Sequence, residues 1–144
     1  MSQNYPYGVG ISNVGSYQVS GIPYATSSIT APSNAGTPTQ VSFPDVTQRI
    51  FVSNINTAAP LRVGFSANGV SGTNYFVIPA ATSTTSFPTQ EFRVKVSSIF
   101  ILSHTTTPTS ASVFAELSNI GASHLVNSGP NGVGNNWSGS VGVG

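Results

Sequence analysis

Residues 91–96 read Glu-Phe-Arg-Val-Lys-Val, and this stretch decides the fold class. Three apolar residues alternate with three charged residues along it. Period-two alternation is typical of a β-strand that has one buried face and one solvated face. We therefore expect a strand at 91–96, whose apolar side chains point inward (Phe92, Val94, Val96) and whose charged side chains point outward (Glu91, Arg93, Lys95).

Segments of the same character surround this stretch. Leu61, Val63 and Phe65 alternate with polar residues, whereas 98–103 is an almost continuous apolar run that favours a strand buried on both faces. The predicted strands are 39–43, 48–54, 61–66, 74–78, 91–96, 98–103 and 112–117, with a short one near Phe87. Apolar residues do not recur at helical spacing anywhere over ten residues or more. Short strands separated by turn residues predict an antiparallel sandwich or barrel.

The chain divides into three parts by composition. Residues 1–38 and 121–144 are rich in Gly, Ser, Asn and Pro, and they flank a β domain at 39–120. The N-terminal part, an arm in which 17–19 could add one strand, either orders on assembly or stays loose, as chain termini commonly do. The C-terminal part holds the single tryptophan, Trp137, which docks either on a neighbouring copy or on its own domain.

Charge is scarce in this sequence. Four Lys/Arg and three Asp/Glu make 5% of the chain, against about a quarter in an ordinary soluble domain. All of them lie between Asp45 and Glu116. Because solubility as a free monomer normally depends on surface charge, we expect the protein to be covered by copies of itself or by partners. Four scattered basic residues do not form a nucleic-acid-binding patch.

The residue types needed for chemistry are equally few. The chain has no cysteine and two histidines, His104 and His124, for which we expect surface or loop positions. Neither a nucleophile motif nor metal-ligand spacing is present, so we predict that the protein is not an enzyme and holds no metal or cofactor. Asn136-Trp137-Ser138 matches the glycosylation triplet, but such triplets arise by chance in a tail rich in Asn and Ser, so we do not expect it to be glycosylated. No apolar run approaches the ~18 residues that span a membrane.

The charged face of residues 91–96 has two interpretations. It is either an ordinary solvated face, with cross-strand pairs to Glu116 or Arg62, or an edge or subunit contact at which a few charges fix the register. Proline residues support the strand assignments, because proline is tolerated at strand ends, where all of these fall: Pro44, Pro60, Pro79, Pro88 and Pro108.

Three segments carry a resemblance to a known family. They are Arg-Ile-Phe-Val-Ser-Asn-Ile-Asn-Thr-Ala-Ala-Pro-Leu-Arg-Val-Gly-Phe at 49–65, Asn-Tyr-Phe-Val-Ile-Pro at 74–79 and Phe-Arg-Val-Lys-Val at 92–96. Together they resemble the vertex (penton) proteins of icosahedral double-stranded DNA viruses of the double-jelly-roll lineage, including the large algal and giant viruses. The resemblance covers about residues 40–120 and depends on strand order and turn placement.

The resemblance implies both a fold and a function. The fold is an all-β, single antiparallel sandwich (jelly roll) of about eight strands, with an extended N-terminal arm and a Gly-rich C-terminal tail. The function is that of a homopentameric penton at the five-fold vertices of a virion, assembled in the host cytoplasm and in contact with major and minor capsid proteins. The alternative is a viral or phage fibre or decoration domain that binds glycans or a receptor, for which Tyr75 and Phe76 are the candidate contacts.

Overall fold

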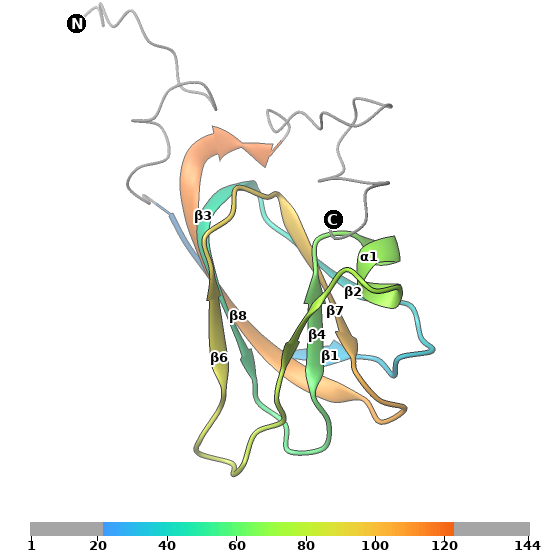
Figure 1. Ribbon diagram of the computed structural model, residues 1–144. Coiled ribbons are helices and arrows are strands. Elements are labelled where there is room, and N and C mark those ends of the chain that lie inside the picture. The colour runs from blue at the N-terminus through green and yellow to red at the C-terminus, as the bar shows by residue number, and fades with distance from the viewer. Residues whose placement is uncertain (1–21, 123–144) are drawn as a thin grey trace, which may run out of the picture.

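The computed structural model describes residues 22–122 as two packed β-sheets of four strands each (Figure 1). The elements in chain order are β1 (Ile22–Ala31), β2 (Thr39–Ser42), β3 (Asp45–Asn54), β4 (Leu61–Gly64), α1 (Ala67–Ser71), β5 (Phe76–Ile78), β6 (Thr89–Phe92), β7 (Ser98–Ser103) and β8 (Thr109–Gly121). Sheet A has the strand order β1-β8-β3-β6, and sheet B has the order β2-β7-β4-β5. All strand pairs are antiparallel.

The strand order is that of a jelly roll. The chain passes back and forth between the sheets, and only β4 and β5 are consecutive strands of the same sheet. Eight antiparallel strands in two sheets connected in this way form two interlocked Greek keys. The predicted fold class, an all-β antiparallel sandwich of about eight strands, is therefore confirmed.

The core lies between the two inner faces. Strands β3 and β8 alternate buried and less buried residues along most of their length, as period-two packing requires. The apolar run of β7 is buried at nearly every position, and only Phe100 is partly exposed. Fully buried side chains from both sheets meet in the middle, among them Ile50, Val52, Leu61, Val63, Ile99, Ile101 and Val113.

The segment that decided the fold class keeps its predicted alternation but not its predicted length. Val94 and Val96 point inward and Lys95 is exposed, yet β6 ends at Phe92. Beyond it, the Thr47 hydroxyl donates to the Val94 carbonyl (2.7 Å) and accepts from the Val96 amide (3.1 Å). These side-chain bonds take the place of a regular backbone ladder between β3 and the residues that follow β6. The register of β3 against β8 is also irregular on both sides of Thr47. After β6 the chain crosses from sheet A to β7 in sheet B.

The predicted domain boundary at residue 39 is wrong. Residues 22–31, assigned to the arm, form the edge strand β1, which pairs with β8. Tyr24 and Ile29 both pack on the core, five positions apart, because a bulge between Thr26 and Ile29 shifts the register and Ser28 adopts a φ of 60°. This phase change hides the strand from a period-two reading. The possible strand at 17–19 lies outside the described residues.

Two further differences concern α1 and β8. No helix was predicted between the expected strands 61–66 and 74–78, but α1 occupies 67–71. The Ser66 hydroxyl caps it by accepting from the Gly69 amide at 2.9 Å. Strand β8 continues to Gly121, past the predicted end at residue 117. Each of the five prolines named above directly precedes or follows a strand, as predicted. The tail residues 123–144 lie outside the described part of the chain.

Candidate functional site

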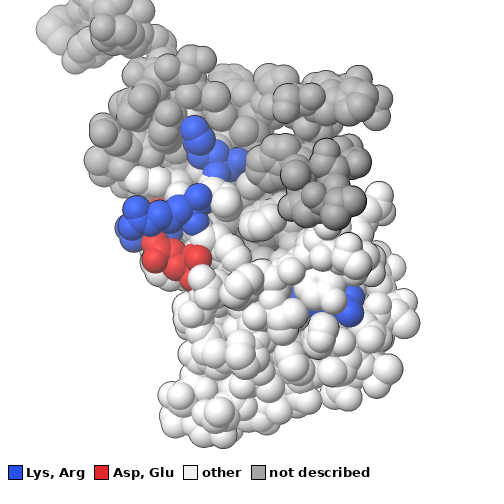
Figure 2. Space-filling view, in the orientation of Figure 1, with Lys and Arg blue, Asp and Glu red and all other residues white. Residues whose placement is uncertain are grey.

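An ion network crosses the outer face of sheet A. Arg49 on β3 lies between two carboxylates, Glu91 on β6 (3.1 Å) and Glu116 on β8 (3.1 Å), and Arg93 also reaches Glu91 (3.2 Å). The hydrogen bond from Arg49 is the main cause that lowers the pKa of Glu91, and the two carboxylates raise the pKa of Arg49. One guanidinium thus ties the three neighbouring strands β8, β3 and β6 in register. In Figure 2 most of the charged atoms in view gather on one side, a separate basic patch lies on the opposite side, and most of the remaining described surface is uncharged.

The structure decides which pairing the charged strand face makes. Glu91 pairs with Arg49 and Arg93, and Glu116 pairs with Arg49. Arg62 does not join this network, because it lies on β4 in the other sheet. Beside the network, the rings of Phe51 and Phe114 lie 6.0 Å apart, and Phe114 is 40% exposed.

A second cluster lies on the outer face of sheet B around Arg62. Its guanidinium carbon lies 4.3 Å above the ring of Tyr75, and its Nε donates to Nδ1 of His104 at 3.2 Å. Another guanidinium nitrogen donates to the carbonyl oxygen of Val70 at 3.3 Å. Arg62 therefore fastens α1, the start of β5 and the end of β7 to the centre of the sheet.

The Arg62 cluster does not have the arrangement of a catalytic histidine. A general base in a nucleophile–base–acid set is oriented by a carboxylate that accepts from its ring N–H. In His104 the Nδ1 atom instead accepts from a guanidinium, so the imidazole proton lies on Nε2 when this bond is made. The other histidine, His124, lies outside the described residues.

Helix α1 is positioned by close backbone contact as well as by Arg62. A Cβ atom at Gly64 would lie 2.8 Å from Cβ of Val70, so a larger residue cannot stand there without movement of the helix. The last turn of α1 then leads into residues 72–75, where the Asn74 amide donates to the Gly69 carbonyl at 3.0 Å. These contacts fix the loop that precedes β5.

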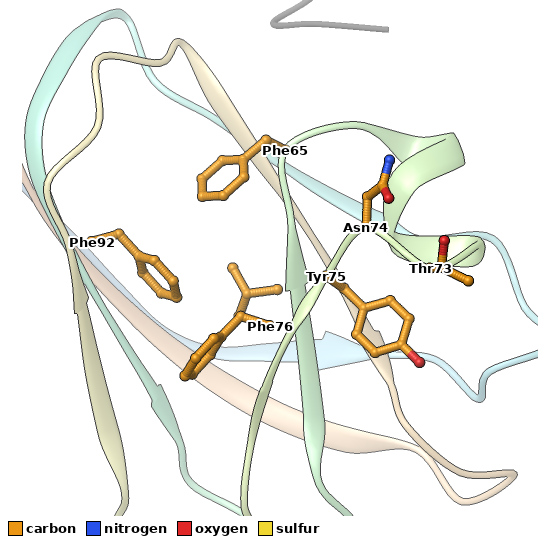
Figure 3. A pocket seen from close by; sticks show the side chains of 7 residues that line it. Phe65, Thr73, Asn74, Tyr75, Phe76 and Phe92 are labelled. Atoms are coloured by element: carbon orange, nitrogen blue, oxygen red, sulfur yellow. The ribbon is translucent and has the colours of Figure 1, made fainter. Parts of the chain in front are cut away.

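This loop borders a cavity between the edge strands β5 and β6, which we call the aromatic cavity (Figure 3). It has a volume of about 350 Å³ and is lined by Val63, Phe65, Thr73, Asn74, Tyr75, Phe76 and Phe92. The ring of Phe92 meets those of Phe65 (6.0 Å) and Phe76 (5.7 Å) edge to face. Phe76 is 46% exposed, and none of the described residues that line the cavity is charged.

The aromatic cavity follows from the sheet order. Phe76 belongs to sheet B and Phe92 to sheet A, and their strands β5 and β6 are the edges on the same open side of the sandwich. Figure 3 shows the three phenylalanine rings turned toward one another, whereas Tyr75 points away from them. A cavity of this size, mostly apolar with a few polar groups, has the character of a ligand or side-chain binding site.

The sequence identified part of this site. Tyr75 and Phe76, named as candidate contacts, both line the aromatic cavity. Phe65 and Phe92 were predicted only as inward-facing residues, because the strand pattern does not say where two sheet edges face each other. The stacking of Arg62 on Tyr75 was missed, since it depends on the pairing of β4 with β5.

Neither a metal centre nor a membrane-spanning helix is present in residues 22–122. No group of three His, Asp or Glu side chains comes together there as metal ligands do. Helix α1, with five residues, falls far short of the length that crosses a bilayer. No protein-family model, curated protein or solved structure matches this chain.

Proposed function

We propose that this chain is a structural subunit of a viral capsid, five copies of which close a penton ring at each icosahedral vertex. In this role the protein performs no catalysis. It binds its own copies and the neighbouring major and minor capsid proteins, and it becomes part of the virion after assembly in the cytoplasm of the host cell.

The observation that carries the proposal is the strand order of the two sheets, β1-β8-β3-β6 and β2-β7-β4-β5. This eight-stranded jelly roll is the architecture of many viral capsid domains, although lectin domains and cupins also have it. Because one fold serves several functions, the fold supports the proposal only together with the properties of the surface.

The surface properties favour assembly over a free monomer. The outer face of sheet A concentrates charge in the Arg49 network. Within residues 22–122, three large apolar side chains are at least 40% exposed: Phe76, Phe87 and Phe114. Neutral and partly apolar faces are suited to contacts with other subunits, where charged residues are depleted.

The mass of the full-length protein in solution tests the proposal. Native mass spectrometry and sedimentation velocity should both show a complex of five chains, and labelling in particles should place it at the five-fold vertices. A trimer would point to a fibre instead. A monomer at all accessible concentrations would contradict the proposal.

The contribution of the terminal segments needs deletions that respect β1. Removal of residues 1–38 would delete a strand that pairs with β8 along most of its length, so it would destroy the fold together with any assembly. Removal of residues 1–21 or 123–144 leaves every described strand in place. We expect each deletion to lower the mass of the oligomer and to leave the melting temperature nearly unchanged. An unchanged oligomer mass would exclude an assembly role for the deleted segment.

One observation favours a second function, the recognition of glycans or a receptor by a fibre or decoration domain. The lining of the aromatic cavity includes the exposed Phe76 and the polar residues Thr73 and Asn74. Tyr75, which also belongs to the lining, turns its ring away from the three phenylalanine rings (Figure 3). Aromatic faces with adjacent hydroxyl and amide groups suit the mixed polarity of a sugar ring. A glycan array with the full-length protein tests this function, with a Phe76→Ser variant as the control for binding at the cavity.

A further inference from the structure

The aromatic cavity and the tryptophan of the C-terminal tail have complementary properties. Trp137 is the only tryptophan of the chain, and no other Phe, Tyr or Trp follows Phe114. The sequence of residues 123–144 contains no charged side chain, and neither does the lining of the cavity. We propose that the aromatic cavity of one copy binds the tail segment around Trp137 of a neighbouring copy. This inference rests on the proposed assembly into a closed ring.

The position of the cavity supports this occupant. The described chain begins and ends at one end of the sandwich, since Ile22 pairs with Leu117 and Gly121 pairs with Asp45. The cavity lies toward the same end, because its residues Phe65 and Phe92 follow β4 and close β6 there (Figure 1). The tail therefore leaves the domain from the end at which the cavity lies.

The chemistry of the cavity suits an indole. Its three phenylalanine rings already meet edge to face, an arrangement that a further aromatic ring can extend. A buried indole needs an acceptor for its Nε1–H, and two residues of the lining, Thr73 and Asn74, carry a side-chain oxygen. On either side of Trp137 the tail has only Asn, Ser and Gly for several residues, whose short side chains allow the backbone to approach the cavity closely.

Ring symmetry supports binding between copies. A ring with an odd number of subunits needs head-to-tail contacts, in which one surface of a subunit meets a different surface of the next. A tail segment and a cavity form such a pair. The tyrosines of the N-terminal arm (Tyr5, Tyr7, Tyr17) and a sugar are the competing occupants, and the experiment separates them from Trp137.

Trp137 reports its own environment, because it is the only tryptophan. In the assembled full-length protein we expect a blue-shifted emission and weak quenching by acrylamide, both lost on dilution. Phe76→Ser should raise the concentration at the midpoint of this transition by about tenfold to a hundredfold, since it removes a large apolar contact. The matched control is Phe87→Ser, which has a similar exposure (42% against 46%) but lies in the loop before β6, at the opposite end of the sandwich.

A mixing experiment tests whether the contact is between copies. A trace of wild-type chain, diluted until its emission is that of an exposed indole, is titrated with an excess of the full-length Trp137→Ala variant. Binding between copies predicts a return to the blue-shifted emission. The same excess of the Phe76→Ser, Trp137→Ala double variant should not produce it.

Each result decides the inference separately from the proposed function. A five-chain complex in which Trp137 stays exposed overturns the inference and leaves the capsid proposal standing. Emission that stays blue-shifted in a monomer, without effect of the added variant, shows binding within one chain and overturns it. Equal shifts of the midpoint concentration by Phe76→Ser and Phe87→Ser also overturn the inference. Assembly that survives Trp137→Ala but is lost when residues 1–21 are removed overturns it as well.

Discussion

The buried side chain of Asn54 provides the sharpest test of how the sandwich is held together. It lies at the end of β3 with no exposed surface, and its amide donates to the carbonyl oxygens of Ala59 (2.9 Å) and Pro79 (3.0 Å). Its Oδ1 accepts from the Asn56 amide (3.2 Å) and from the Thr109 hydroxyl (3.0 Å). One side chain thus joins the β3–β4 turn, the end of β5 and the start of β8.

We expect Asn54→Ala to lower the free energy of unfolding by about 4 kcal/mol. Each of the four hydrogen bonds contributes roughly 1 kcal/mol net to the free energy of unfolding. The variant also leaves buried donors and acceptors without a partner, which adds to the loss. The Thr109→Val variant, which removes one of the four bonds at nearly constant shape, should cost about 1 kcal/mol. Asn54→Asp should also be strongly destabilising, because a carboxylate cannot donate to the two carbonyl oxygens.

Urea unfolding at a protein concentration where the mass is that of one chain measures these differences. The slope of the free energy against urea should stay constant across the series, so that the midpoints report stability alone. If Asn54→Ala lowered the free energy of unfolding by no more than Thr109→Val, the four hydrogen bonds of Asn54 would not hold these segments together, and the reasoning would be refuted.

Three further predictions concern the surface clusters and α1. Because the pKa of Glu91 is lower in the folded protein than its ordinary value of 4.5, its pairing with arginine stabilises above that pH and the contribution disappears as the pH falls through the folded pKa; the melting temperature of Glu91→Gln should therefore approach that of the wild type in acid. Gly64→Ala should cost about 1–3 kcal/mol in urea unfolding, since its Cβ would lie 2.8 Å from Cβ of Val70. Arg62→Lys should increase proteolysis in the α1 loop, because a lysine cannot both stack on Tyr75 and keep the guanidinium hydrogen bonds.

Each of these has an internal control. A constant difference in melting temperature between wild type and Glu91→Gln across the acid range would contradict the pH argument. The double variant Gly64→Ala, Val70→Ala should lose less than the two single changes together, since the smaller residue makes room for the new methyl group. Unchanged cleavage in Arg62→Lys would show that the cluster does not hold the loop.

The sequence predicted the fold where one face of a strand is buried without interruption. Alternation along β8 and the apolar run of β7 were sufficient, because a shift of one residue would turn a whole set of apolar side chains to solvent. It failed for β1, where the bulge beside Ser28 places Tyr24 and Ile29 in opposite phase. It also failed for α1, whose five residues are too few to show a helical period.

The candidate site was predictable only in part, because it depends on contacts between sheets. Phe65 and Phe92 are ordinary inward-facing residues within their own segments. They line a cavity only because β5 and β6 are edge strands that face each other across the open side of the sandwich. No local pattern encodes which strands become edges. The contact of Arg62 with Tyr75 was also not predictable from a local pattern. Tyr75 directly precedes β5, and it meets Arg62 because β5 pairs with β4.

The edges of the two sheets explain how a chain with so few charges avoids open-ended strand pairing. Edge strands commonly carry charges that block further pairing, but among the three short edges β2, β5 and β6 only β6 carries one, Glu91. These three strands are instead only three or four residues long. The longer edge strand β1 is interrupted by its bulge and carries Pro23, which has no N–H to offer a further strand. Further backbone pairing is therefore limited mainly by the length and shape of the edge strands, and much of the charge on the outer faces is gathered in the Arg49 network and the Arg62 cluster. This combination favours assembly through side chains into closed complexes, and it disfavours growth into fibres through the backbone.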